Sequence, residues 1–160
     1  MKIISLWEPW ATLMALGKKR IETRSWRTPY VGWLAIHASK GGLSKADLRR
    51  ALQEDRFSGA LAGESPSPGC IVAVVYLVSC EETAARGHIR GVFDLWPELD
   101  TPAERAFGNY EIGRYAWVTG RLFRLPTPIP YRAHQGLYDL ESPFADGIRT
   151  QMNAARAENK

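Results

Sequence analysis

Residues 69–80 read GCIVAVVYLVSC, which is the longest apolar run in the chain. A run of this length that is rich in valine is typical of a strand covered on both faces. We therefore expect it to form the central strand of a sheet. Cys70 and Cys80 lie at the two ends of the run, about 33 Å apart in an extended chain. That separation excludes a disulfide between them, so both are expected as reduced thiols.

The segments on either side of this run show further strand and helix signals. Strands are expected over 2–7, 20–26, 32–39, 70–80 and 114–125, extended chain over 126–131, and a turn with a short strand over 132–140. Pro9 suits the start of a helix over 8–16, and Gly17 suits the position after its end. Other helices are expected over 44–55, near 83–86 and over 146–160. This pattern predicts an α+β fold: a small, partly open β-barrel with flanking helices.

Size and composition narrow the class of protein. A chain of 160 residues is expected to form one domain with a core of its own. No apolar run approaches the roughly 20 residues that span a bilayer, and no signal-peptide pattern is visible, so we expect a cytoplasmic protein with no membrane partner. The histidines are far apart in sequence and no Cys-x-x-Cys pair occurs, so neither a metal site nor a cofactor is expected.

The charge is unevenly distributed along the chain. The net charge is +4, but residues 1–50 carry +7, residues 51–112 carry −6 and residues 113–160 carry +3. A positive surface on one side of a protein is expected for a nucleic-acid or phosphate partner. The alternative is that these charges only solvate the surface.

Residues 17–24, GKKRIETR, hold the densest cluster of charges. On a strand over 20–26 alternate side chains share one face, here Arg20, Glu22, Arg24 and Trp26. Lys19 has the wrong parity for that face, so we expect it to project from the turn after Gly17 into the same cleft. The sequence therefore predicts a charged cleft with a tryptophan at one end.

The chemistry of this cluster leaves three hypotheses open. Glu22, between two arginines, is suited to accept a hydrogen bond from the amino group of a nucleic-acid base. Lys19, which stands among other cations, would suit a base or nucleophile in an enclosed site. The third hypothesis is an ion-pair cluster with a structural role, in a domain that binds other proteins.

The tryptophans divide between stacking and core positions. Trp7 and Trp26 border polar segments and are candidates for stacking on bases. Trp10, on the apolar face of the first helix, and Trp33 and Trp117, within apolar strands, are expected in the core. His37 ends a buried strand and is more typical of a hydrogen-bonded structural histidine than of a catalyst.

The opening third of the chain, together with its later strands, resembles the ASCH domain, the activating-signal-cointegrator homology domain. The family signature G-x-K-x-x-E-x-R falls on Gly17, Lys19, Glu22 and Arg24. The segments PWA at 9–11, GCIVAVVYLVSC at 69–80, YAWV at 115–118 and PIPYRAHQGLYDL at 128–140 also fit in order. The resemblance covers about residues 3–140.

This resemblance implies a PUA-like small β-barrel of five to six mostly antiparallel strands. It places a single domain at residues 1–145, followed by a C-terminal helix or tail at 146–160. ASCH domains are thought to bind RNA or DNA through a cleft lined by the signature residues, and we expect RNA rather than DNA. The residues expected to contact nucleic acid are Trp7, Lys18, Lys19, Glu22, Arg24, Trp26, Arg27, His37, Lys40 and Gln135.

Some small bacterial relatives resemble amidohydrolases that act on acetylated cytidine, and others have been proposed to cleave RNA. In the amidohydrolases a lysine, a threonine and a glutamate are the catalytic groups. Lys19 matches the lysine, but Glu22 stands where those relatives carry threonine. If the protein were a hydrolase, Lys19 and Glu22 would be its catalytic residues. The departure at Glu22 favours the nucleic-acid-binding branch.

Overall fold

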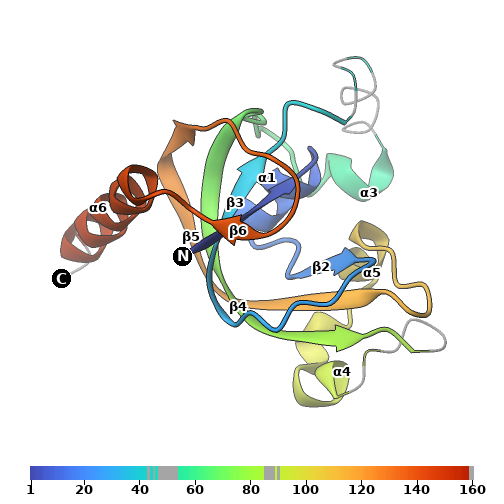
Figure 1. The fold of residues 1–160 in the computed structure, drawn as a ribbon. Helices are drawn as coiled ribbons and strands as arrows, with labels where there is room; N and C mark the ends of the chain where they lie inside the picture. The colour runs from blue at the N-terminus through green and yellow to red at the C-terminus, as the bar shows by residue number, and fades with distance from the viewer. Residues whose placement is uncertain (43, 45, 47–53, 85–88, 90, 159–160) are drawn as a thin grey trace.

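The computed structural model of the protein describes residues 1–42, 44, 46, 54–84, 89 and 91–158. Six strands of this part form one sheet in the order β2-β5-β4-β3-β1-β6 (Figure 1). Their bounds are β1 Lys2–Leu6, β2 Ile21–Arg24, β3 Gly32–Ala38, β4 Cys70–Glu82, β5 Tyr115–Pro130 and β6 Tyr138–Asp139. β1 and β3 are parallel and the other neighbours are antiparallel. The mostly antiparallel α+β fold expected from the sequence is confirmed.

β4 is a central strand, as its apolar run predicts. It lies between β3 and β5, and its residues 71–75 are all buried. A strand with neighbours on both sides and cover on both faces must be apolar at consecutive positions. Both cysteines are free thiols, which agrees with their expected separation.

The sheet is open. The sequence predicts a partly open barrel, but the strands do not close into a barrel. β2 pairs with β5 and β6 pairs with β1, so these two short strands lie at opposite edges. β5 is longer than the strand expected over 114–125, since residues 126–130, expected as extended chain, also belong to it. The register between β4 and β5 shifts between Ile71 and Ala73. Prolines at 126 and 128 lack the N–H that a regular ladder needs, which accounts for the shift.

The helices are short except for the last. They are α1 Trp10–Ala15, α3 Asp55–Ser58, α4 Val92–Leu95, the 3₁₀ turn η2 Pro97–Leu99, α5 Pro102–Phe107 and α6 Ser142–Glu158. α1 matches the helix expected over 8–16, and α6 begins four residues before the expected 146. Most of the helix expected over 44–55, and half of the one near 83–86, lie outside the described residues. No helix in the described part has both the length and the hydropathy needed to cross a membrane.

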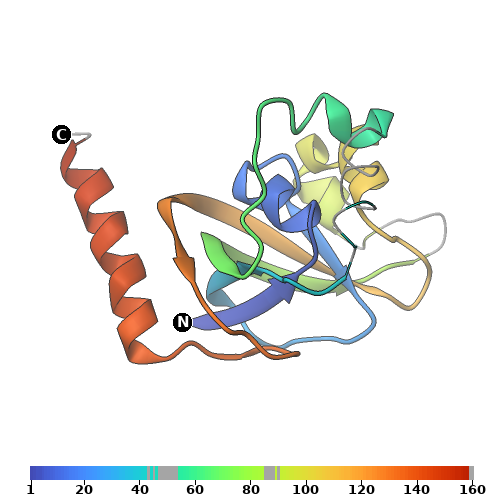
Figure 2. The same ribbon diagram turned by 90° about the horizontal axis from the view of Figure 1, so that it is seen from above.

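Two apolar clusters lie on opposite faces of the sheet. α1 covers one face, where Met14 packs with Ile36 and Val75. On the other face, Ala145 and Ile148 of α6 pack with Val74 and Leu125. Figures 1 and 2 show α6 standing apart from the group of short helices. Of the short helices, α1 lies against β3 and β4, so one face of the sheet carries α1 and the other carries α6.

Candidate functional site

The turn between β1 and α1 places two tryptophans beside the charged strand. Trp7 follows β1 directly and is 55% exposed, whereas Trp10 begins α1 and is half-buried. The ring of Trp10 packs edge-to-face on Phe57, with 5.8 Å between centroids. Trp10, expected in the core, therefore presents part of its ring at the surface.

Trp7 is held against the backbone at Gly42. A Cβ built at Gly42 would lie 2.6 Å from the indole, and Gly42 has φ of +104°, a region that other residues rarely adopt. The indole therefore lies directly on the backbone of the loop after β3. This contact explains how an exposed tryptophan takes a defined position.

β2 alternates as its sequence predicts. Ile21 and Thr23 are buried, while Glu22 and Arg24 are half-buried on the opposite face. Arg24 Nε lies 3.1 Å from Glu22 Oε1. Arg24 also donates from Nη2 to the carbonyl oxygen of Ser5, at 2.8 Å. These contacts fix the guanidinium between the strand and the end of β1.

Lys19 is buried, which differs from the expected cleft-facing position. It is 1% exposed, its Nζ donates to the carbonyl of Ile21, and the same atom lies 3.5 Å from Glu22 Oε2. Lys19 precedes β2 and its side chain points toward the core, where its ammonium forms an ion pair with the buried side of Glu22. A phosphate contact would need an exposed ammonium, and Lys19 lines neither the hollow beside β2 nor the two that adjoin it.

A helix that was not expected from the sequence, α5, forms a further wall beside the tryptophans and the charged strand. α5 has Thr101 as its N-cap, whose hydroxyl accepts from the Glu104 N–H at 3.0 Å, and Pro102 in its first turn. These are ordinary helix-start signals, and Gly108 follows the end of the helix. The charged, loop-rich composition of residues 81–112 obscured them.

Glu104 of α5 holds the start of β2 in place. Its carboxylate accepts from the backbone N–H of Arg20 at 2.6 Å and of Ile21 at 3.0 Å. Burial raises the pKa of Glu104, while the charge of Lys19 and these two N–H groups act in the opposite direction. Glu104 thus connects α5 to the start of β2.

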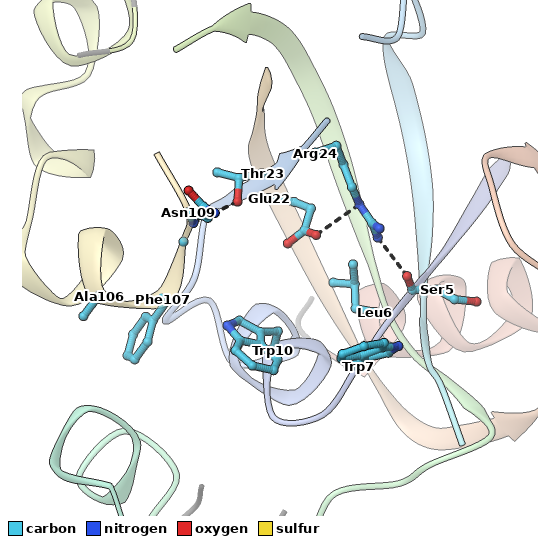
Figure 3. Close-up of a pocket in the computed structure, with 11 residues that line it drawn as sticks. Ser5, Leu6, Trp7, Trp10, Glu22, Thr23, Arg24, Ala106, Phe107 and Asn109 are labelled. Atoms are coloured by element: carbon cyan, nitrogen blue, oxygen red, sulfur yellow. Dashed lines mark hydrogen bonds and ion pairs between the residues drawn. The ribbon is translucent and has the colours of Figure 1, made fainter. Parts of the chain in front are cut away.

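These elements enclose one hollow of about 440 Å³, which we call the main hollow (Figure 3). It is lined by Ser5, Leu6, Trp7, Trp10, Glu22, Thr23, Arg24 and residues 106–109. Figure 3 shows the two tryptophans on one side, Glu22 and Arg24 on the opposite side, and Phe107 with Asn109 on a third. The hollow therefore combines aromatic walls with one carboxylate and one guanidinium.

The comparisons with known proteins identify the family. The family model of the ASCH domain matches residues 4–112. The chain belongs to the ASCH domain family. The resemblance noted in the sequence is thereby confirmed, and the signature residues Glu22 and Arg24 line the main hollow of this ASCH domain.

Curated relatives match over part of their length. The chain is 34% identical over 80 residues to activating signal cointegrator 1 of Homo sapiens and, equally, of Mus musculus. The match covers 48% of this chain and 14% of each relative. The chain thus matches a small part of the length of these relatives.

Solved structures support the fold. The ASCH protein of Zymomonas mobilis matches with a TM-score of 0.54 and 14% identity, over 93% of both chains. A serine-to-alanine mutant of the same Zymomonas mobilis protein matches with a TM-score of 0.53 and 15% identity, over 93% of this chain and 94% of the other. At this identity the likeness shows the fold alone.

The other residues expected to contact nucleic acid fall into two groups. A second hollow of about 650 Å³ is lined by Trp26 and Gln135, with Trp7 and Arg24. A third hollow of about 590 Å³ is lined by His37 and Lys40. Lys18 and Arg27 are exposed but line none of the three hollows. Of the ten candidates, seven therefore lie along these hollows.

His37 has the structural bonding that its position in a buried strand predicts. It is 4% exposed, and its Nε2 lies 3.1 Å from the carbonyl oxygen of Tyr131, which can only accept. Nδ1 therefore accepts from the Ser5 hydroxyl, at 3.0 Å. Burial lowers the pKa of His37, and the charge of Lys40 lowers it further, against the Tyr131 carbonyl that raises it. A neutral, doubly bonded His37 orients its neighbours and carries no charge for a phosphate.

Proposed function

We propose that this ASCH domain binds single-stranded nucleic acid and holds one unstacked base in the main hollow. The observation that carries the proposal is the pairing of aromatic walls with Glu22 and Arg24 in one open hollow. Proteins that read unpaired bases stack them on aromatic side chains and bond their edges. We expect the base to stack on Trp7 with its edge toward Glu22 and Arg24.

The charges in the hollow suit a base edge better than a phosphate. Glu22 is the one carboxylate in the lining, and its charge is balanced by Lys19 behind it and Arg24 beside it. Glu22 accepts from an amino group such as N4 of cytosine, and Arg24 donates to a ring nitrogen or carbonyl. The phosphates of the strand then contact exposed cations outside this hollow.

The test is binding of fluorescently labelled single-stranded RNA and DNA, measured by anisotropy at about 50 mM salt. Trp7→Ala is expected to weaken binding about tenfold, since stacking contributes roughly 1–3 kcal/mol per base. Arg24→Ala is expected to weaken it by a similar factor, since a hydrogen-bonded contact to the base edge is lost. Arg121→Ala removes the same charge from an exposed position that lines none of the three hollows, and is expected to bind as the wild type does.

The folded state of each variant is checked by its thermal unfolding, because Arg24 also bonds the Ser5 carbonyl. RNA is expected to bind more tightly than DNA of the same sequence. Wild-type affinity in both Arg24→Ala and Trp7→Ala would overturn the proposal, as would a wild-type protein that binds neither nucleic acid.

A further inference from the structure

The three hollows adjoin one another through shared lining residues. The main and second hollows share Ser5, Trp7 and Arg24. The second and third hollows share Ser39, Gly41 and Ala133. The three hollows are therefore neighbours on the surface, and we call them together the groove, which runs from α5 past Trp7 to the segment between β5 and β6.

The charge along this groove changes with position. The second and third hollows contain no carboxylate among their lining residues, but Arg24, Lys40 and Arg132 line them. Lys40 and Arg132 are both exposed, and no carboxylate of the described residues forms an ion pair with either. The two cations at the far end of the groove are thus available to an anion.

Lys40 is positioned by its aliphatic stem. A Cβ built at Gly69 would overlap Cε of Lys40, so the stem lies flat on the Gly69 backbone. This arrangement matches the one that seats Trp7 on Gly42. The groove therefore has a placed aromatic ring near its middle and a placed cation at its far end.

From these observations, and resting on the proposed function, we infer that a nucleic-acid strand follows the whole groove. The base held in the main hollow begins a path that passes over Trp7 and Trp26, and its phosphates reach Lys40 and Arg132 two or more nucleotides away. Exposed aromatic rings interleaved with cations are the usual means of binding a single strand along its length. Affinity is then shared between one base and a backbone contact remote from it.

The test compares a dinucleotide with an oligonucleotide of about eight nucleotides, within the usual site size of single-strand-binding domains. The double variant Lys40→Gln/Arg132→Gln keeps long side chains but removes both charges. It is expected to bind the dinucleotide like the wild type and the longer strand about tenfold more weakly. Loss of two phosphate contacts should also lower the slope of log K against log salt by about 1.4. Arg121→Gln/Arg156→Gln, a pair of exposed arginines that line none of the three hollows, is the matched control.

The outcomes separate this inference from the proposed function. If the double variant binds the longer strand with wild-type affinity and salt slope while Arg24→Ala weakens it, the strand path is wrong and the base site stands. If the double variant binds both ligands more weakly by the same factor, Lys40 and Arg132 do not contact a part of the strand remote from the base, and the path is again wrong. If Arg24→Ala changes the affinity for neither the dinucleotide nor the longer strand, the proposed function and the path both fail.

Discussion

At the scale of single residues, burial separates side chains that the sequence presents as alike. Lys18 and Lys19 are neighbours of the same type, yet Lys18 is exposed and Lys19 is 1% exposed. Alternation along β2 fixes the faces of Glu22 and Arg24, but Lys19 precedes the strand, where no period applies. The turn decides its direction, and the turn depends on Glu104, which is far away in sequence.

Replacing Lys19 tests its role as a buried partner of Glu22. Lys19→Met keeps the length of the side chain but leaves Glu22 without the ammonium behind it. We expect the free energy of unfolding to fall by about 3 kcal/mol, as for other buried pairs that lose one member. Urea unfolding measures this loss, and Lys18→Met, at the exposed neighbour, should change stability by less than about 0.5 kcal/mol. An unchanged stability in Lys19→Met would show that Lys19 does not hold the site.

Glu22 is expected to set base preference. Because a carboxylate accepts from an amino group, the wild type should bind oligocytidine more tightly than oligouridine, by about 1 kcal/mol. Glu22→Gln should reduce this difference, since its amide also donates. Competition binding with the two oligonucleotides measures the preference, and Glu82→Gln, at an exposed residue that lines none of the three hollows, is the control. Equal preference in wild type and Glu22→Gln would remove Glu22 from base recognition.

At the scale of elements, strands were easier to predict than the helices that complete the site. β1, β3 and β4 follow from apolar runs and alternation, and β2 from its alternating charges. α5 has six residues, too few for a helical period to stand out, although Thr101, Pro102 and Glu104 mark its start. The sequence therefore does not predict the side of the main hollow that α5 forms. Without that side, it also does not predict that Trp10 lines a hollow.

The junction of α5 and β2 should respond to pH through Glu104. Burial raises the pKa of this carboxyl above its ordinary value of 4.5, and a raised pKa in the folded state means that folding favours the protonated form. The stability contributed in this way is complete below the unfolded pKa and is lost as pH rises through the folded pKa. Relative to Glu104→Gln, which does not titrate, the wild type should lose stability as pH rises from about 4.

Urea unfolding of the wild type and Glu104→Gln across this range measures the difference between them. Glu8, whose pKa is also raised by burial, is present in both proteins and cancels in the comparison. A difference that stays constant or grows in favour of the wild type with rising pH would contradict the assignment.

At the scale of the whole molecule, the sheet places the main hollow away from the last helix, and α6 meets only the far end of the groove, where Phe144 lines the third hollow. The sequence indicated strand number and class, but the edge order depends on contacts between residues far apart, such as the pairing of β1 with β3 and β6. The open sheet leaves β2 as an edge strand, and the main hollow forms beside it. The apolar run of β4 predicts a central strand, but the local patterns of β1, β2 and β6 do not decide which of these strands become edges.

The packing of α6 gives a prediction about the extent of the domain. The boundary at residue 145 stays a prediction, but Ile148 is 0% exposed in the cluster shared with Val74 and Leu125. A chain ending at Ala145 should be about 3 kcal/mol less stable than one ending at Met152, because burial of Ile148 is lost. Thermal and urea unfolding of the two chains provide the comparison. Equal stabilities would show that residues after 145 add nothing to the core.

The most direct test of the central claim is a crystal structure of the protein bound to a short single-stranded oligonucleotide. We predict that one base lies in the main hollow against Trp7, with its edge bonded to Glu22 and Arg24. An oligonucleotide bound elsewhere, with the main hollow free of any base, would contradict the account.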